Sequence, residues 1–235
     1  ASVLCFTDGN TIVPMISAQD HKRISDGDRG ANTGGMGAYA PAPVMTKELD
    51  KIVYDTILLS AVKAMKKEGC PFKGCLYAGL MITKDGPKVV EFNCRFGDPE
   101  TEAVLPLLES DLAKIMLACT KGTLKKEKLE GKNACAVDVV LASEGYPATH
   151  SSGEEIVGLE EAKKTGCLVF HAGSMKKNGR YFVNGGRVLN VVAVAPTLKE
   201  ARDKAYEGVS KISWRGMQYR HDIADKGLKR LKKRK

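Results

Sequence analysis

The chain has 235 residues, 43% of them hydrophobic, which predicts a globular protein with one domain or two small ones. No apolar run approaches the roughly 20 residues of a membrane helix, and the opening residues ASVLCFTDGN lack the pattern of a signal peptide. The net charge is +9, but the last ten residues, KGLKRLKKRK, hold seven Lys and Arg and no acid, so the remainder carries +2 and predicts no basic face for nucleic acid.

The N-terminal third begins with a strand pattern, SVLCFTDG, and a second short strand is expected at residues 11–15. Residues 17–43 are polar and punctuated by Gly and Pro, which predicts a long loop of functional or disordered character. Thr46 is expected to cap a helix over residues 47–67, because apolar residues recur there near helical spacing.

A hairpin is predicted next, with strands over residues 76–83 and 88–96 and a turn at Lys84–Pro87. Asp98 and Pro99 have the residue types of a helix N-cap and first helical position. A second helix is expected from about Ser110 to Gly122.

The C-terminal half predicts strands and short helices in alternation. The expected strands are residues 134–141, 167–172 and 186–195, with a hairpin at 178–179, and the expected helices are 160–165 and about 197–212. Hairpins in this number favour an α+β or mixed α/β fold with antiparallel sheet, and argue against a doubly wound parallel sheet.

One predicted strand, KVVEFNCRF, carries polar residues at alternate positions. Strand side chains alternate between faces, so Glu91, Asn93 and Arg95 are expected on one face and the apolar residues, Cys94 included, on the other. The Cα atoms of Glu91 and Asn93 would lie roughly 6.5–7 Å apart, a spacing from which the two side-chain oxygens can reach one Mg²⁺ ion. Arg95 could bind a phosphate or carboxylate. Ordinary solvated residues on an edge strand would have the same pattern.

The segment DGDRGANTGGMGAY, residues 26–39, is rich in glycine. It is neither a dinucleotide-binding fingerprint, since prolines follow where a helix should start, nor a phosphate-binding loop of the Walker type, since Met36 stands where Lys is needed. Its backbone N–H groups could line an anion site, or the segment could be a flexible loop. Basic residues just upstream, Lys22 among them, favour phosphate binding.

Other chemistries find little support. The four histidines form no zinc-binding pattern, and no nucleophile elbow is present. The seven cysteines are scattered without a C-x-x-C pair, which is typical of core thiols in a reducing cytoplasm, and Cys94 is expected to be one of them.

Taken together, these motifs resemble one family of ligases. DHKR, DGD-x-G-x-NTGGMGAY-x-P, EFN-x-RFGDPE, HAG, GGRVL-x-V and YR-x-DI occur in that order over nearly the whole chain. They resemble the glycinamide ribonucleotide synthetases (phosphoribosylamine–glycine ligases), which are ATP-grasp enzymes of purine synthesis. The implied fold is the C-terminal portion of an ATP-grasp domain, with antiparallel sheet and flanking helices, followed by a small C-terminal α/β domain.

The resemblance implies ligation of glycine to 5-phosphoribosylamine with ATP as a substrate, through a glycyl phosphate. Glu91 and Asn93 would hold Mg²⁺ or Mn²⁺, Arg95 would neutralise charge on the acyl phosphate, and Asp98 would hold the amine. The substrate-binding residues implied are Lys22, Thr33, Gly34, Gly35, Met36 and Gly37.

The resemblance also implies boundaries: an ATP-grasp portion at residues 1–132, a small domain at 133–225 and a basic tail at 226–235. Gly79 stands near the position where many ATP-grasp relatives have a further acidic metal ligand. Earlier parts of the family are absent, so weak or no activity is expected of residues 1–235 alone. The animal forms suggest fusion to other purine-synthesis domains.

Two alternatives remain open at this point. One is another ATP-grasp carboxylate–amine ligase or carboxylase of purine metabolism, which Glu-x-Asn-x-Arg alone would fit equally well. The other is a binding or assembly module in which the basic tail contacts RNA, with no catalysis; salt-sensitive retention of RNA would indicate it.

Overall fold

The computed structural model describes residues 1–233 and forms two compact units that interleave along the chain. The first unit comprises Ala1–Gln19, Pro41–Gly97 and Leu107–Asn133. The second comprises Asp20–Ala40, Asp98–Pro106 and the residues from Ala134 onward. The division predicted between residues 132 and 133 stays a prediction. The last passage between the units lies close to it, while two earlier segments pack with the C-terminal residues.

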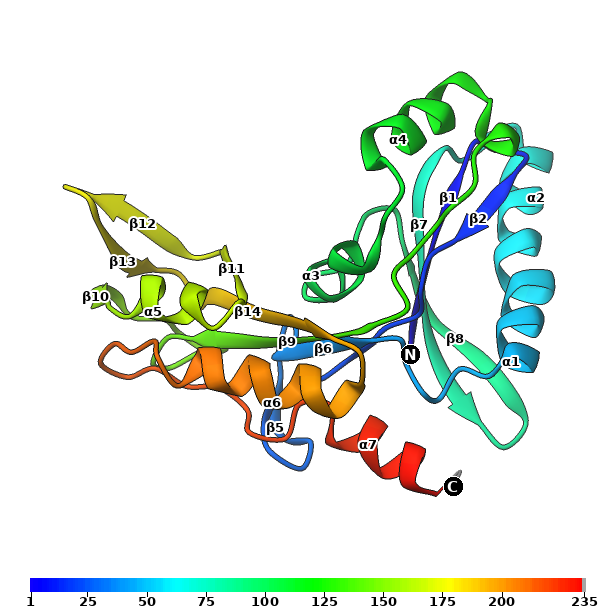
Figure 1. Ribbon diagram of the computed structural model, residues 1–235. Helices are drawn as coiled ribbons and strands as arrows, with labels where there is room; N and C mark the ends of the chain where they lie inside the picture. Colours follow the sequence, from blue (N-terminus) through cyan, green and yellow to red (C-terminus); the bar gives the residue numbers. More distant parts are fainter. Residues whose placement is uncertain (234–235) are drawn as a thin grey trace. The chain divides into compact units, whose positions relative to one another are not determined.

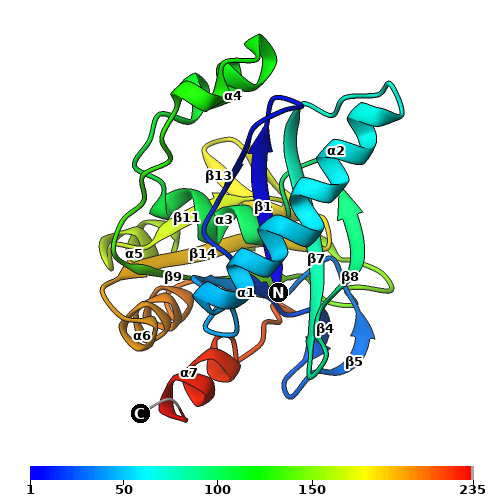
Figure 2. The same ribbon diagram turned by 90° about the vertical axis from the view of Figure 1, so that its right-hand side faces the viewer.

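The first unit is built on a four-stranded antiparallel sheet in the order β2-β1-β7-β8. Its strands are β1 (Ser2–Thr7), β2 (Ile12–Pro14), β7 (Gly74–Thr83) and β8 (Gly86–Asn93). A continuous helical rod crosses one face of this sheet (Figure 2): α1 (Lys47–Ile52), a π-helical segment (Val53–Leu58) and α2 (Leu59–Lys67). The unit also contains α4 (Leu112–Lys121) and a 3-10 turn (Leu124–Lys126).

The helix ends of this unit confirm the predicted cap at Thr46 and the expected limits of the second helix. Thr46 Oγ1 accepts a hydrogen bond from the N–H of Leu49 at 3.2 Å, and Asp111 Oδ1 accepts one from Lys114 at 3.0 Å. Gly122 ends α4 with a φ of 71°, which glycine adopts without a Cβ penalty. The rod buries Val53, Leu58 and Val62 in a core with β1 and β7, at roughly 1.5–3 kcal/mol for each such side chain.

The burial of β8 differs from the prediction. Val90 is 67% exposed, Phe92 is 45% exposed and Cys94 is also exposed. The expectation of an apolar face, with Cys94 as a core thiol, is therefore wrong. The physical reason is position: β8 is the edge strand of its sheet, so alternation of side chains does not bury either set completely.

The second unit is built on a sheet in the order β11-β14-β9-β6-β3. Its strands are β6 (Gly37–Ala40), β9 (Cys135–Ala142), β11 (Leu168–His171) and β14 (Arg187–Ala195), with β3 (Gln19–Asp20) at the passage between the units. α6 (Leu198–Val209) packs on one face and α3 (Glu100–Val104) on the other, as Figure 1 shows. The α6 side holds most of the core, including Val137, Val139 and Val191.

Smaller elements complete this unit. A three-stranded sheet in the order β10-β13-β12 consists of β10 (Ser152–Ile156), β12 (Ser174–Lys177) and β13 (Arg180–Asn184). A hairpin of β4 (Arg23–Ser25) and β5 (Arg29–Asn32) precedes β6, and α5 (Leu159–Lys164) packs near β11. The capping box of α6 is present, with Thr197 and Glu200 in reciprocal hydrogen bonds.

The prediction of a loop over residues 17–43 is wrong for much of its length. β6 pairs with β9 and all four of its residues are buried. The strand escapes local prediction because Gly-Ala-Tyr-Ala has low intrinsic strand propensity and its partner follows roughly a hundred residues later.

The basic tail is helical where the structure describes it. α7 (Asp225–Lys232) buries Gly227, and Leu228 packs on the core of the second unit. Residues 234 and 235 of the predicted tail lie outside the described residues. The fold class is confirmed as mixed helix and antiparallel sheet. Within residues 1–233, none of the helices has both the length and the apolar character needed to cross a membrane.

Candidate active site

Glu91 and Asn93 share a face at the open edge of the first unit's sheet. Glu91 pairs with Gly79 and Asn93 with Tyr77, two positions apart along β8. Neither side chain has a hydrogen-bond partner within residues 1–233, and Glu91 is exposed. Two oxygen donors are thus presented on one strand without an internal use.

The space beside Glu91 depends on Gly79. A Cβ placed on Gly79 would lie 3.2 Å from Cγ of Glu91 and 3.3 Å from the ring of Tyr77. A third acidic ligand at this position would therefore crowd the first. The glycine fits an arrangement in which the glutamate side chain lies across its neighbour strand.

This donor set suits a hard divalent cation with a small protein share of ligands. Residues 1–233 contain no group of three or more His, Cys, Asp or Glu that could hold a metal. Mg²⁺ commonly takes one or two protein oxygens and fills its octahedron with phosphates and water. Glu91 and Asn93 fit that requirement, whereas the all-protein cage of a structural zinc site would not be met.

Arg95 departs from the predicted row. β8 ends at Asn93, and Arg95 lies in the bend that follows, where its Nη1 donates to the carbonyl of Phe96 at 2.9 Å. The polar row on the strand is therefore a pair, with the exposed guanidinium beyond its end. The alternation rule stops applying where the ladder stops.

In the second unit, the backbone N–H groups at the start of the glycine loop, Thr33–Gly37, donate hydrogen bonds to acceptors inside the protein. Thr33 N donates to Lys22 O, Gly34 N to the hydroxyl of Tyr146, Gly35 N to Thr33 Oγ1 and Met36 N to His21 O. Met36 and Gly37 are buried, the latter in β6. Within this arrangement the four N–H groups of Thr33–Met36 have acceptors inside the protein, so the anion-binding nest expected from the glycines is not formed by them.

The hairpin before this loop is fixed by the C-terminal YR-x-DI motif. Arg220, whose side chain is fully buried, donates from Nε and Nη2 to Asp222 at 2.7 Å each and from Nη1 to Asp28 at 2.9 Å. Asp222 also accepts from Gly27 N at 2.9 Å, and Asp26 accepts from His221 N at 2.8 Å. Lys22 pairs with Asp20 at 2.6 Å. The charges of the DGD motif therefore serve the fold.

Asp98 is held by Arg187 of β14. Nη1 of Arg187 donates to Asp98 Oδ1 at 2.8 Å and to the Asp98 carbonyl at 3.1 Å, and lies 3.5 Å from the carbonyl of Gly35. The predicted N-cap role of Asp98 is wrong, because α3 begins at Glu100 after Pro99, and the Asp98 carboxylate pairs with Arg187 instead. The Asp98 side chain is 49% exposed, and its Oδ2 has no partner within residues 1–233.

Two further acids lie in the charge environment of this pair. Burial raises the pKa of Glu102 above its ordinary value, and burial raises the pKa of Asp138 well above it, although Asn190 donates to Asp138 Oδ2 at 2.8 Å. Glu102 Oε2 and Asp138 Oδ1 are buried without a hydrogen-bond partner in the described chain. Arg187 lowers the pKa of both acids, so it is the cation that this group shares.

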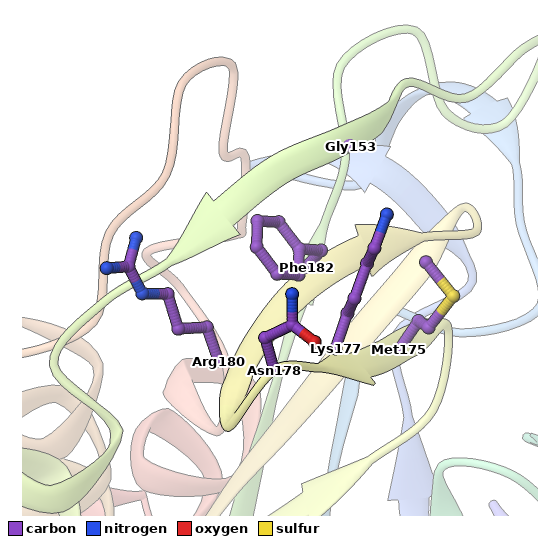
Figure 3. A pocket seen from close by; sticks show the side chains of 6 residues that line it. All are labelled: Gly153, Met175, Lys177, Asn178, Arg180 and Phe182. Atoms are coloured by element: carbon purple, nitrogen blue, oxygen red, sulfur yellow. The ribbon is translucent and has the colours of Figure 1, made fainter.

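A hollow of about 480 Å³ lies on the three-stranded sheet of the second unit (Figure 3). Met175 and Lys177 enter it from β12 and its end, and Arg180 and Phe182 from β13. Arg180 is paired with Glu155 at 3.3 Å. None of the predicted site residues lines this hollow, so it does not enter the candidate site.

The predicted residues thus fall into two groups. Glu91, Asn93 and Arg95 belong to the first unit, whereas Asp98, Lys22 and the glycine loop belong to the second. Prediction missed Arg187 and Tyr146, which hold the second group together. Arg187 stands inside GGRVL, where two glycines before an arginine at a strand start were the available signal.

Two family models match most of the chain. Phosphoribosylglycinamide synthetase, ATP-grasp (A) domain, matches residues 1–101, and phosphoribosylglycinamide synthetase, C domain, matches residues 136–226.

Curated relatives are similar over nearly all of its length. They include a trifunctional purine biosynthetic protein adenosine-3 of Gallus gallus (53% identity over 97% of this chain and 23% of the relative) and a chloroplastic phosphoribosylamine–glycine ligase of Arabidopsis thaliana (50% identity, 97% and 44%). The chain spans about half the length of the single-function ligases that it matches.

Solved structures have the same fold. The crystal structure of phosphoribosylamine–glycine ligase from Thermotoga maritima superimposes with a TM-score of 0.85 at 38% identity, covering 94% of this chain and 54% of that one. Urea carboxylase of Kluyveromyces lactis superimposes with a TM-score of 0.65 at 12% identity, which is a likeness of fold alone.

Proposed function

The chain belongs to the phosphoribosylglycinamide synthetase family, and we propose that it forms the metal-binding and C-terminal part of an ADP-forming ligase that joins glycine to 5-phosphoribosylamine. The observation that carries the proposal is the likeness in sequence and fold to the Thermotoga maritima ligase over 94% of the chain. In this chain the EFN-x-RFGDPE motif runs from β8 to the start of α3, and the glycine loop leads into β6.

The reaction has two steps. A carboxylate oxygen of glycine attacks the γ-phosphorus of ATP, and the bond from that phosphorus to ADP breaks, giving glycyl phosphate. The amine nitrogen of phosphoribosylamine then attacks the carbonyl carbon, the bond from that carbon to the phosphate oxygen breaks, and the nitrogen gives up a proton. Glycinamide ribonucleotide, ADP and phosphate result.

The residues divide these tasks. Glu91 and Asn93 would hold Mg²⁺ or Mn²⁺, which supplies charge neutralisation at the phosphates when bound. The exposed guanidinium of Arg95 would stabilise negative charge on the acyl phosphate. Asp98 would bind the amine through Oδ2, since Oδ1 is taken by Arg187.

The glycine loop and Lys22 would bind the sugar phosphate or glycine. Because the N–H groups of Thr33–Met36 already have acceptors, binding there would use the side chains of Thr33 and Lys22 or a rearranged loop.

The other candidate functions gain no specific observation. The carboxylases share the fold at 12–16% identity, which carries no activity to this chain. The names of trifunctional relatives in chicken, human and cattle support a further proposal, that the chain occurs fused to other purine-synthesis domains. The cytoplasmic location stays a prediction, and one relative is chloroplastic by name.

The test joins residues 1–235 to the part of the Thermotoga maritima ligase that they do not match, since they cover 54% of that chain. We call the product the joined protein. The joined protein should form ADP only when glycine, phosphoribosylamine and Mg²⁺ are all present, and the product should be glycinamide ribonucleotide by mass. Residues 1–235 alone should show weak or no turnover. ADP formation that ignores glycine, or ligation of another carboxylate in its place, would contradict the proposal.

A further inference from the structure

We propose that Arg187 is a positioning residue for the second step: one guanidinium nitrogen fixes Asp98 and the glycine loop in a single arrangement. This inference rests on the function proposed above. It concerns a residue whose side chain contacts Asp98 and the glycine loop.

The contacts converge on one nitrogen. Nη1 of Arg187 donates to Asp98 twice, to the side chain at 2.8 Å and to the carbonyl at 3.1 Å, and lies 3.5 Å from the Gly35 carbonyl. Arg187 itself is anchored at the first position of β14, where its carbonyl accepts from Gly173 N at 2.8 Å. The side chain of Arg187 therefore links both Asp98 and the glycine loop to the central sheet of their unit.

Gly34 and Gly35 leave the space that this contact needs, because neither has a side chain. A Cβ on Gly34 would lie 2.9 Å from Cζ of Arg187, so the guanidinium lies flat against the glycine backbone. A Cβ on Gly35 would lie 2.3 Å from Cδ of Pro99, and its φ of 125° excludes most other residues. The absence of side chains at both positions lets the residues around Asp98 approach the loop closely.

Tyr146 supports the same loop from a second direction. Its hydroxyl accepts from Gly34 N at 2.9 Å, and its ring packs so closely on Gly186 that a Cβ there would lie 2.4 Å from the ring. Gly186 immediately precedes Arg187. Both side chains that reach the loop are thus set by the same Gly-Gly-Arg turn into β14.

The charges indicate which acid Arg187 serves. Glu102, Asp98 and Asp138 all interact electrostatically with Arg187, but only Asp98 accepts hydrogen bonds from it. The bonded acid is half exposed, while Glu102 Oε2 and Asp138 Oδ1 are buried. An ion pair at the accessible acid holds that carboxylate in one orientation, which is what binding an amine requires.

Substitution of Arg187 is expected to affect only the step that uses phosphoribosylamine. Arg187→Met in the joined protein should lower kcat/KM for phosphoribosylamine by about 100-fold, because loss of alignment near 1 Å has an effect of that size. Glycine-dependent isotope scrambling in ATP without the amine, which reports glycyl phosphate formation, should stay near the unsubstituted rate. Arg187→Lys keeps the charge without the planar fork and should lose about tenfold.

A double-mutant cycle separates positioning from a general structural role. In an Asp98→Ala background, Arg187→Met should cost less than about threefold more, since the group it aims is gone. The matched control is Arg180→Met, an exposed arginine of the same unit paired with Glu155, which should change kcat/KM by less than about twofold.

Thermal melting curves check that each variant folds. If Arg187→Met does not fold, the test is made with Arg187→Lys. Equal losses with and without Asp98, or near-normal kcat/KM in Arg187→Met, would overturn the inference. An unsubstituted joined protein that makes no glycinamide ribonucleotide would instead overturn the proposed function, so the two failures are distinct.

Discussion

Strand β8 in the first unit and Asp98, which pairs with Arg187, in the second unit both present polar side chains that the sequence predicts to be functional. On β8, Glu91 and Asn93 lie at an exposed sheet edge without partners in the described chain. In the second unit, Asp98 and the N–H groups of Thr33–Met36 are bound by the protein itself. The first arrangement is open to an external ion, whereas the second is already fixed.

The difference between these two regions shows that the free-energy cost of an unpaired polar group depends on its burial. A buried polar atom without a partner costs free energy, so a protein normally satisfies it. An exposed one costs little, since water satisfies it until a ligand arrives. Substitutions should therefore affect ligand-dependent activity at β8, and stability at the buried ion pairs of the second unit.

The largest effect is expected at Arg220. Arg220→Met removes a fully buried guanidinium that pairs with both Asp222 and Asp28, which should cost about 3–5 kcal/mol in urea unfolding at pH 7. Arg215→Met, at a side chain that is 87% exposed, is the control and should stay within about 0.5 kcal/mol.

The pH dependence of that cost has a definite sign. Burial alone would raise the pKa of Asp222, but hydrogen bonds from Arg220 hold it far below its ordinary value. A depressed acid contributes stability above its unfolded pKa and loses it on acidification. The deficit of Arg220→Met should thus shrink below about pH 4. A deficit independent of pH would show that packing, not charge, holds the hairpin.

An intermediate effect is expected on β8, and on function only. Glu91→Ala and Asn93→Ala in the joined protein should each lower Mg²⁺-dependent turnover by about 100-fold and weaken Mn²⁺ binding in titrations. Their unfolding free energies should stay within about 0.5 kcal/mol of the unsubstituted protein. Asp85→Ala, in the turn of the same hairpin, is the matched control. Normal turnover in either variant would refute the metal assignment.

The smallest effect is expected at Asp138. Burial raises its pKa, and an acid with a raised folded pKa loses stability as the pH climbs from its unfolded pKa toward the folded one. Asp138→Asn does not titrate, so its stability relative to that of the unsubstituted protein should rise as the pH climbs above about 4. Parallel stability curves for the two proteins would mean that Asp138 stays charged inside the fold.

The predictable parts of the fold rest on local signals. Caps at Thr46, Asp111 and Thr197, the turn before β8 and the strand β1 all follow from neighbouring residues, and all are present. Strand β6 and the exposure of β8 do not, because β6 pairs with a strand distant in sequence and β8 is the edge strand of its sheet among residues 1–233.

The site divides in the same way. Glu91 and Asn93 share a face because alternation along a strand is local, whereas Arg95 leaves the row because the ladder ends at a point set by tertiary contacts. The use of Asp98 by Arg187, 89 positions away, is a long-range contact for which no local pattern exists.

The interleaving of the two units has a consequence for how the chain acquires its structure. β6 is completed as the chain emerges, but β9, against which it pairs, follows roughly a hundred residues later. At ribosomal rates of about 5–20 residues per second, Tyr39 and its neighbours wait on the order of ten seconds for their partner strand. During that interval the segments of the first unit can come together, so we expect the sheet of β1, β2, β7 and β8 to form before the sheet that carries Arg187.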